Sequence, residues 1–556
     1  MRESSCEGRV KLANLTTGVR FGWKLVRFLR QPPPSVDASR AALVSELESR
    51  TERFLHLLDI AVWSVPASPY RKLFEVAGVE AGDVKELVEK LELEGALERL
   101  RDLGVYVTSD EWAGTKPIRR GSAAFEVRPQ DFFNPLLRPD YFGSTGASRS
   151  SGTPVASTFA SKKASQHRRV VRLSAWEVAG APTATWFPVL PSSAGFNSVT
   201  SSVALRQPVE RWFSQVDPAL RDISEEKRLA VRLLPLAARL AGTRIPRPEL
   251  ATPSQPGLVL DWCLDALRRR GRALLSGYTS SLVSLARAAA ERHRDLSGLV
   301  LATSGEPLTQ EKTSAILAVN AVPLDTYAFA QVGGVATACT HRPVGELHVW
   351  ETDVAVITRE GCRPDGRSVS VFLWTTLQPS ARNIFVNVSS DDYGVLRRDD
   401  QPCTCGFGSL GFRTTVGQIR GLSKVVTGGI TLPPDVLHDV VERQLPQQFG
   451  GTPVDYQFLE TEVGGRSCLV LRVDPALRVD DAAVLQAVSV RLRASEAGML
   501  ADEVWETGVD LRVQRQPPVP TRSGKVLALE TLEQDPGDPP SHATSGVAIS
   551  REAPRP

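Results

Sequence analysis

The chain has 556 residues with a formal net charge of +3, and 42% of its residues are apolar and 23% charged. This composition is typical of a globular protein, and the length exceeds what one hydrophobic core serves, so two or more domains are expected. The small charge and the scattered basic residues give no reason to expect nucleic acid or an anionic membrane as a partner.

The seven cysteines are too sparse for a disulfide scaffold, and their number is odd. The chain shows neither a secretory signal nor a run of eighteen apolar residues. Residues 19–34 mix basic and apolar side chains and could lie on a membrane, but we favour a surface helix that ends at the prolines. We therefore expect a cytoplasmic protein without stable membrane insertion, whose cysteines serve metal binding or chemistry. A homodimer is left open.

Helical signals dominate the first hundred residues. Residues 36–59 carry apolar side chains near helical spacing, with Ser35 or Asp37 placed to cap the helix. A second helical stretch covers 82–103, and a loop-rich region follows over 104–166.

From residue 258 onward, short apolar strands alternate with helices. The predicted helices and strands are, in order, 258–271, 273–278, 280–293, 298–303, 309–320 and 322–327. This alternation indicates a parallel sheet with right-handed crossovers, in which ligands bind at the carboxyl ends of the strands. Residues 303–307 and 326–331 lie at such ends.

The pattern changes twice after residue 345. Residues 345–415 predict β structure and turns. Further on, a small α+β domain is predicted from strands 455–463, 466–473 and 508–515 with a helix at 480–495. The predicted fold class is α/β: a large N-terminal domain (1–418) with mainly parallel sheets, helices and a β-rich subdomain, then a small α+β C-terminal domain (419–530). The Pro-, Gly- and Ser-rich tail 531–556 is expected to be disordered.

The stretch "DYFGSTGASRSSGTPV" (140–155) is rich in glycine and hydroxyl side chains. Glycines let backbone N–H groups approach a phosphate, and hydroxyls add hydrogen bonds. Taken alone, this composition favours a plain surface loop. Together with the motifs that follow, we favour phosphate binding.

Five landmarks follow one another in a definite order: this loop, "GEP" (305–307), an Asp-x-Tyr (325–327), an arginine–glycine hinge and "TRSGK" (521–525). The order resembles the superfamily of adenylate-forming enzymes, which comprises acyl-CoA synthetases, adenylation domains and luciferases. Within it, the phenylacetate–CoA ligase branch, including its capsule-biosynthesis relatives, is the most similar. The resemblance is clearest over 270–529 and continues back to 104–122.

The resemblance implies that the loop binds the β- and γ-phosphates of ATP. The residues that match parts of the family pattern are Ser144, Thr145, Gly146, Ser151, Gly152 and Thr153. The first three residues belong to "GSTG" (143–146) and the last three to "SGTP" (151–154), and which of these two segments aligns with the family motif stays open. The lysine usual in this loop is missing, and Arg149 is the only cation inside it.

The adenine-binding positions implied by the resemblance are Gly305, Glu306 and Pro307, together with Tyr327, whose ring can stack on a purine. The family's Mg²⁺-binding glutamate falls on Gln331, a neutral amide that binds this ion poorly. Either the triphosphate and water hold the ion, or the site has lost its chemistry.

For ribose binding the resemblance points to Asp392, with Asp391 as the alternative, because a carboxylate suits two vicinal hydroxyls. Arg420 joins this set and stands nine residues before Gly429, the separation seen in the phenylacetate branch. The family's acidic hinge residue is absent at 422–423.

Cys339, His348, Cys403 and Cys405 form two close pairs of soft ligands that suit a closed tetrahedral Zn²⁺ site. Similar Cys, His and Cys-x-Cys arrangements occur in the phenylacetate branch. His341 is a rival for the imidazole position, and reduced surface thiols are the alternative reading. The zinc would be structural, because no ligand position is left for water.

The implied reaction is ATP-dependent activation of a carboxylic acid to an acyl-adenylate with release of pyrophosphate, followed by transfer to coenzyme A or a carrier-protein thiol. Lys525 matches the superfamily's catalytic lysine, and hinge rotation separates the two steps. Two alternatives stay open: a nucleotide-binding homologue with impaired catalysis, and transfer to a non-thiol acceptor. Pocket residues are expected in 185–200 and around Gly277 and Tyr278.

Overall fold

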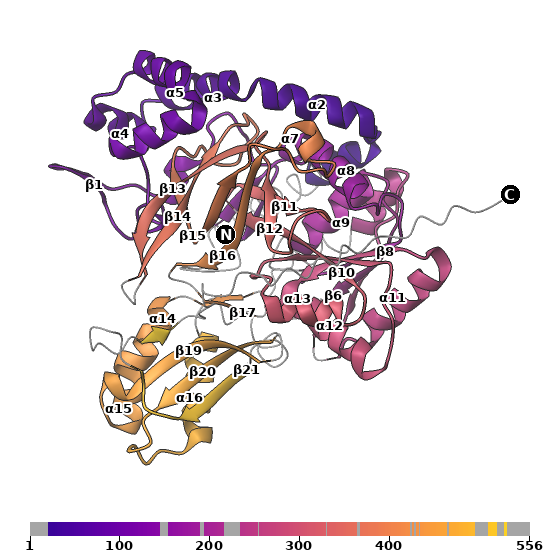
Figure 1. The fold of residues 1–556 in the computed structure, drawn as a ribbon, viewed down its shortest axis with the longest axis vertical. Helices are drawn as coiled ribbons and strands as arrows, with labels where there is room; N and C mark the ends of the chain where they lie inside the picture. Colours follow the sequence, from indigo (N-terminus) through magenta and orange to yellow (C-terminus); the bar gives the residue numbers. More distant parts are fainter. Residues whose placement is uncertain are drawn as a thin grey trace, which may run out of the picture.

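The computed structural model describes residues 20–144, 154–189, 194–215, 234–253, 255–329, 331–363, 367–422, 425–427, 430–432, 434–463, 466–494, 510–519 and 528–530. These residues form a large part built on a long sheet and a C-terminal lobe with a separate sheet, drawn in orange to yellow (Figure 1). The α/β fold class predicted from the sequence is confirmed.

One half of the long sheet is parallel. Its strands are, in spatial order, β10 (Val322–Phe329), β9 (Leu299–Ser304), β8 (Ala273–Tyr278), β5 (Thr183–Trp186), β6 (Val209–Ser214) and β7 (Pro248–Leu250). Helices α11 (Gly257–Arg270), α12 (Thr279–Glu291) and α13 (Gln310–Leu317) connect or precede its central strands. The alternation predicted over 258–327 is therefore confirmed. Its apolar residues form a core around Leu275, Leu285 and Leu301.

The other half of the sheet is antiparallel and continues without a break from β10. Its order is β11 (Gly333–Ala338), β12 (Glu346–Val349), β16 (Thr414–Gly421), β15 (Val388–Arg398), β14 (Ser368–Thr376) and β13 (Val354–Cys362). The β structure expected over 345–415 is confirmed, but it extends the same twelve-stranded sheet and does not form a subdomain with a sheet of its own. The pairing of β10 with β11 joins the two halves.

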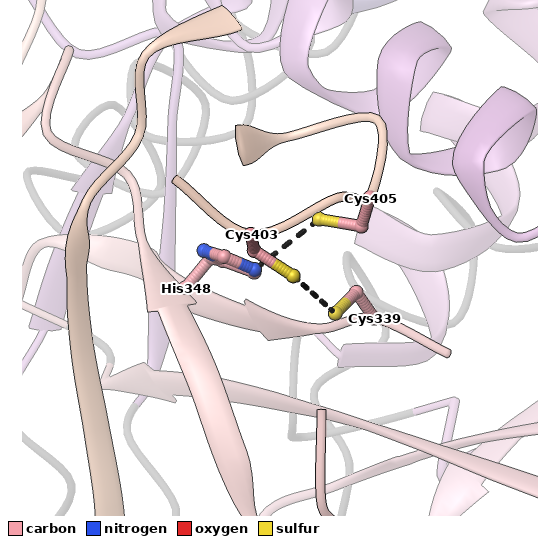
Figure 2. A group of neighbouring side chains, drawn as sticks. All are labelled: Cys339, His348, Cys403 and Cys405. Atoms are coloured by element: carbon pink, nitrogen blue, oxygen red, sulfur yellow. Dashed lines mark hydrogen bonds between the residues drawn. The ribbon is translucent and has the colours of Figure 1, made fainter. Parts of the chain in front are cut away.

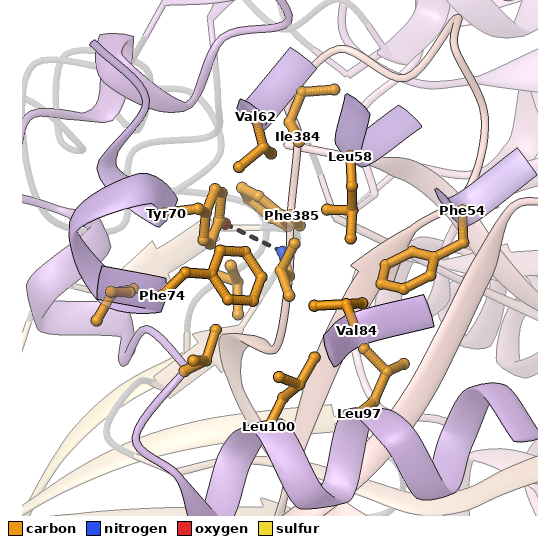
Figure 3. Packing of buried hydrophobic residues seen from close by; sticks show 14 of the residues in the cluster. Phe54, Leu58, Val62, Tyr70, Phe74, Val84, Leu97, Leu100, Ile384 and Phe385 are labelled. Carbon is orange, nitrogen blue, oxygen red and sulfur yellow. Dashed lines mark hydrogen bonds between the residues drawn. The ribbon is translucent and has the colours of Figure 1, made fainter. Parts of the chain in front are cut away.

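Helices from the N-terminal part cover the antiparallel half (Figure 1). They are α2 (Val36–Glu48), α3 (Arg50–Leu58), α4 (Pro69–Ala77) and α5 (Ala81–Asp102). Ser35 caps α2 as predicted, and its hydroxyl accepts from Ala38 N at 3.1 Å. The packing of these helices on the sheet is shown in Figure 3, where Tyr70 Oη accepts from the backbone N–H of Val386 at 3.1 Å.

Two helical predictions need correction. The helical pattern over 36–59 corresponds to two helices, α2 and α3, that are separated at Ser49, the C-cap of α2. The helix over 82–103 is kinked at Glu92, whose φ of 59° is not helical. The kink places Glu94 inside the protein, where its carboxylate accepts from Arg50 at 2.6 Å, so a buried ion pair overrides the simple helical repeat.

The C-terminal lobe has its own sheet and core. The sheet runs β21 (Asp510–Arg515), β20 (Arg466–Val473), β19 (Tyr456–Val463) and β22 (Leu529–Glu530), with α14 (Pro434–Asp439) and α16 (Asp481–Ala494) beside it. Its buried core includes Leu437, Phe458, Leu471 and Val488. The α+β order predicted for this region is confirmed.

The region 104–166, predicted to be loop-rich, holds only short elements where it is described, such as β3 (Tyr141–Ser144), β4 (Pro154–Ser157) and α7 (Phe159–Ala164). The predicted disordered tail, 531–556, lies outside the described residues. Among the residues that are described, no helix is long and apolar enough to cross a bilayer.

Candidate functional site

The carboxyl ends of three parallel strands meet beside the junction of the two sheet halves. Ser304, the last residue of β9, pairs with Tyr278 at the end of β8 and with Thr326 in β10. The "GEP" turn (305–307) therefore begins next to Tyr327, as the alternating pattern predicted for a ligand-binding edge. Gly277 also pairs with Trp186 of β5, and Phe187 packs edge-on against Tyr278 with ring centroids 4.9 Å apart.

Gly305 occupies a position that only glycine suits. Its φ is +82°, and a Cβ atom there would lie 2.7 Å from the Tyr278 ring. The backbone of the turn is thus pressed against an aromatic face. The resemblance assigned Gly305 to adenine binding, and in the structure its nearest neighbour is this ring.

The Glu306 side chain is turned into the protein. Its carboxylate accepts from the Ser280 hydroxyl and lies 3.6 Å from the Lys312 ammonium, and both charged side chains are at most 2% exposed. The Thr279 hydroxyl donates to the Glu306 carbonyl at 3.2 Å. These contacts hold the shape of the turn, which gives the Glu306 side chain a structural role here.

Tyr327 and Asp392, 65 positions apart, are joined directly. The Tyr327 hydroxyl donates to Asp392 Oδ2 at 2.6 Å and lies 3.1 Å from the Ser390 hydroxyl. Burial and the Asp392 carboxylate raise the pKa of Tyr327 well above its usual value, so the phenol stays protonated and donates. The residues predicted for adenine and for ribose therefore lie side by side.

A bulge in β15 separates the roles of the two adjacent aspartates. The pairing of β14 with β15 shifts register between Val371 and Leu373, and Asp391 has a φ of +64°. Asp391 contacts the Ser109 hydroxyl at 3.4 Å, whereas Asp392 faces Tyr327. A left-handed residue at a bulge re-aims its neighbours, so this local distortion directs Asp392 toward the strand ends.

Arg420 lies on β16 beside this pair, with Tyr393 as its register partner. Burial lowers the pKa of Arg420, and the nearby carboxylates of Glu460 and Glu462 oppose that shift. Because both glutamates belong to β19, the arginine faces the C-terminal lobe. Gly429, the other predicted hinge residue, lies outside the described residues.

Asp325 is a further carboxylate at this edge. It accepts from the Thr303 hydroxyl and from the Thr326 N–H, both at 2.9 Å. Burial raises the pKa of Asp325 to about 6, while the two hydrogen bonds and the charge of Lys312 act against that rise. A carboxylate that titrates this close to neutrality is common at functional sites.

Gln331 lies in the turn between β10 and β11, where its carbonyl accepts from Asn383 Nδ2 at 2.7 Å. The described residues contain no cluster of three or more carboxylate or imidazole ligands at this edge. Ser144 is the last residue of β3. The remaining predicted phosphate and catalytic residues lie outside the described residues: Thr145, Gly146, Ser151, Gly152, Thr153 and Lys525.

The four predicted zinc ligands are gathered in one place. The ligand atoms of Cys339, His348, Cys403 and Cys405 all lie within 4.8 Å of one another, and Figure 2 shows them converging: His348 lies on β12, Cys339 directly follows β11, and Cys403 and Cys405 lie on one loop. His341, the rival imidazole, contacts the Thr404 hydroxyl at 2.9 Å and is not a member.

The spacing of this Cys/His cluster fits a tetrahedral ion. Ligands about 2.3 Å from a central Zn²⁺ lie about 3.8 Å apart. The observed Sγ separation of Cys339 and Cys403 is 4.0 Å, and Cys405 Sγ lies 3.3 Å from His348 Nε2. The Cys339 thiol and the His348 ring lower the pKa of Cys405, whereas the same contact raises the pKa of Cys339. Cys405 is therefore the thiolate of this pair, and Cys339 gives up its proton only when a metal binds.

A glycine shapes the loop that carries two of these ligands. A Cβ atom at Gly408 would lie 1.9 Å from the Cys403 carbonyl, and the Gly408 N–H approaches Cys405 Sγ at 3.5 Å. Around the cluster, Leu43 of α2 and Trp350 belong to one buried core. The cluster therefore ties the sheet to an N-terminal helix.

Two buried lysines were missed by the sequence reasoning, and one of them, Lys312, lies at the edge that carries the "GEP" turn. Lys312 contacts the "GEP" turn, and Lys162 on α7 donates to the Thr200 hydroxyl at 3.0 Å. Burial lowers the pKa of Lys162 well below its usual value, and Arg169 and Arg382 contribute to the shift. A lysine amid small and polar residues carries no sequence signal of burial, so neither was detectable without the structure.

Comparison with known proteins gives a likeness of fold at low identity. No family model and no curated protein matches the chain. A solved 2-hydroxyisobutyryl-CoA ligase in a postadenylation state matches with a TM-score of 0.44 and 14% identity over 90% of this chain and 91% of its own. A malonyl-CoA ligase product complex gives 0.39 and 12% over 69% and 72%. A double mutant of o-succinylbenzoate CoA synthetase from Bacillus subtilis gives 0.41 and 12% over 73% and 72%.

Proposed function

We propose that the protein is an adenylate-forming ligase that activates a carboxylic acid with ATP and passes the acyl group to a thiol. One observation carries the proposal. The turn 305–307, Tyr327, Asp392 and Arg420, which the motif order assigned to one nucleotide, converge on a single edge of the sheet that faces the C-terminal lobe.

The residues at this edge have chemistry that suits a nucleoside. The Tyr327 ring packs against Phe329 and the fully buried Trp374 with centroids 5.9 Å and 5.8 Å away, and these contacts hold the ring in place. Asp392 is held as an acceptor by the Tyr327 phenol, and a carboxylate pairs well with the two hydroxyls of a ribose. Adenine would lie against the turn and the ring, with the ribose toward Asp392.

Mg²⁺ is expected to arrive with the triphosphate. A neutral amide at Gln331 and the absence of a carboxylate cluster among the described residues do not fit a dedicated protein site for this ion. The charge on the phosphates would instead be offset by the hydroxyl and glycine loop predicted over 140–155 and by Lys525. Each of these assignments rests on the sequence motifs.

The two half-reactions would be separated by the C-terminal lobe. The first step bonds a carboxylate oxygen to the α-phosphorus and releases pyrophosphate. The second bonds a thiol sulfur to the acyl carbon, releases AMP and frees the thiol proton. Lys525 would offset charge in the first step only. Lys525→Ala should therefore lower adenylate formation by about 10²–10³ and spare thiol transfer from preformed acyl-adenylate.

The deciding experiment is exchange of labelled pyrophosphate into ATP, measured with a panel of aryl and fatty acids. Acid-dependent exchange would establish adenylation, and the preferred acid would define the substrate class. Binding of ATP without exchange for any acid would favour a nucleotide-binding protein with impaired catalysis. Exchange without formation of a thioester from coenzyme A would indicate a carrier-protein thiol or a non-thiol acceptor.

We also propose that the Cys/His cluster binds one structural Zn²⁺ through three thiolates and one imidazole. The ligand spacing and the position of the cluster within a buried core support this, because a closed site that links neighbouring strands to the loop 403–405 stabilises the fold. Protein expressed in zinc-replete medium should contain about one zinc per chain by atomic emission. Metal-free protein of unchanged stability would exclude the proposal.

A further inference from the structure

Lys312, on the first turn of α13, is one of the most deeply buried charged residues in the described chain, with 1% of its surface exposed. Its ammonium donates to Ser467 Oγ at 2.9 Å and to the Pro307 carbonyl at 3.4 Å, and it lies 3.6 Å from Glu306 Oε2. Two of these partners belong to the "GEP" turn, whereas Ser467 belongs to β20 of the C-terminal lobe.

A second contact runs beside the first. The hydroxyl of Thr309, the N-cap of α13, donates to Glu462 Oε1 on β19 at 2.5 Å and also accepts from the Lys312 N–H at 3.3 Å. Helix α12 lies against β20 as well. The start of α13 is therefore a junction at which the turn, the helix and two strands of the lobe meet.

Ser467 is the only hydrogen-bond partner of Lys312 within the described lobe, and it is 5% exposed. If the lobe turned away, the ammonium would gain water in place of this hydroxyl. When the lobe is seated, the charge is out of water, with the Glu306 carboxylate as its nearest anion and Asp325 as a second carboxylate that interacts with it. A buried charge that keeps its counter-ion is tolerated, whereas one that loses its counter-ion is strongly unfavourable.

We infer that Lys312 is a positioning residue that couples the conformation of the "GEP" turn to the orientation of the C-terminal lobe. A change in the turn that moves the Glu306 carboxylate alters the balance of charge around the ammonium, and this in turn alters how firmly the lobe is held at Ser467. This coupling involves no substrate, so its test does not depend on the proposed enzymatic activity.

The charge argument predicts different effects on the seating of the lobe for a single and a double variant. Glu306→Gln removes the nearest anion of the buried ammonium and leaves Asp325 as the carboxylate that still interacts with it, so the seated lobe is destabilised. Glu306→Gln combined with Lys312→Met removes both charges, and replacement of a buried ion pair by apolar groups is often neutral or stabilising. The double variant should therefore keep the lobe seated.

The test is hydrogen–deuterium exchange on the full chain without ligand. Ser467→Ala is the mildest perturbation and should speed exchange about tenfold or more in 310–317 and 466–473, the scale of losing a hydrogen bond to a charged group. Exchange in the central strand 273–278 should stay unchanged. Glu306→Gln should act in the same direction, and the double variant should restore protection to within about threefold of the parent.

Lys85→Met is the matched control, because the Lys85 side chain is 67% exposed on α5 and its partner Glu89 is 64% exposed. It should leave exchange at the junction unchanged. The inference is overturned if Ser467→Ala and Glu306→Gln both leave 466–473 as protected as in the parent. It is also overturned if the double variant is as unprotected as Glu306→Gln, since the removal of charge would then have no effect.

Discussion

Replacement of Asp325 by asparagine should make the stability of the large domain less sensitive to pH. The Asp325 carboxyl group accepts two hydrogen bonds, from the Thr303 hydroxyl and the Thr326 N–H, and the carbonyl of asparagine can accept both. Asp325→Asn therefore keeps the shape and the acceptor but removes the ionisation. The expected change is electrostatic and not a loss of packing.

The magnitude follows from the shift of the Asp325 pKa. Burial raises it from 3.8 to about 6 in the folded protein, a difference of about 2 units or about 3 kcal/mol. Between these two values the folded state holds a proton that the unfolded state has released, so stability falls as pH rises from about 4 to about 6. Above that range this contribution is constant. Asp325→Asn should not show this fall in stability, because residue 325 no longer ionises.

The measurement is denaturant unfolding of the parent and Asp325→Asn at half-unit steps from pH 4 to pH 8. Tryptophan fluorescence reports the large domain, because nine of the ten tryptophans precede residue 423. The variant should gain about 3 kcal/mol relative to the parent between pH 4 and pH 7. Subtracting the two curves removes the contribution of every other titrating group.

Asp295 serves as a control, because its contribution to stability changes with pH in the opposite direction. Hydrogen bonds from Ser297 and Asn320 lower the pKa of this exposed carboxylate, so its contribution to stability is present above its unfolded pKa and lost as pH falls. Asp295→Asn should therefore lose stability relative to the parent as pH rises. A difference curve for Asp325→Asn that is flat from pH 4 to pH 8 would refute the assignment of a raised pKa.

Three further outcomes are expected. Gly305→Ala should lower large-domain stability by about 1–3 kcal/mol, because alanine is strained at positive φ and its Cβ meets the Tyr278 ring; unchanged thermal melting would contradict this. Gly408→Ala should reduce the zinc bound per chain by displacing the loop of Cys403 and Cys405, and a full complement of metal by atomic emission would show that the loop adapts. Tyr327→Phe should weaken ATP binding about tenfold in calorimetry by removing the phenol that donates to Asp392, whereas an unchanged affinity would mean that Asp392 does not contact the ribose.

Local sequence patterns were sufficient to predict several helices and strands, one helix cap and one side-chain cluster. The alternation over 258–327 is a property of short apolar runs and helical repeats, and the parallel strands form where it predicts them. Ser35 caps its helix because a hydroxyl at that point satisfies a free N–H whatever the rest of the chain does. The cysteine and histidine spacing likewise anticipated the Cys/His cluster, since few other uses suit such residues in two close pairs.

Other side-chain contacts were decided by the tertiary structure alone. Tyr327 reaches Asp392 only because β10 and β15 belong to one continuous sheet and a bulge turns the aspartate, and long-range register leaves no periodic trace in the sequence. The burial of Glu306 and Lys312 could not be predicted from the sequence either. A charged residue on a helix is normally solvated, and only the seating of the C-terminal lobe against α13 takes this ammonium out of water.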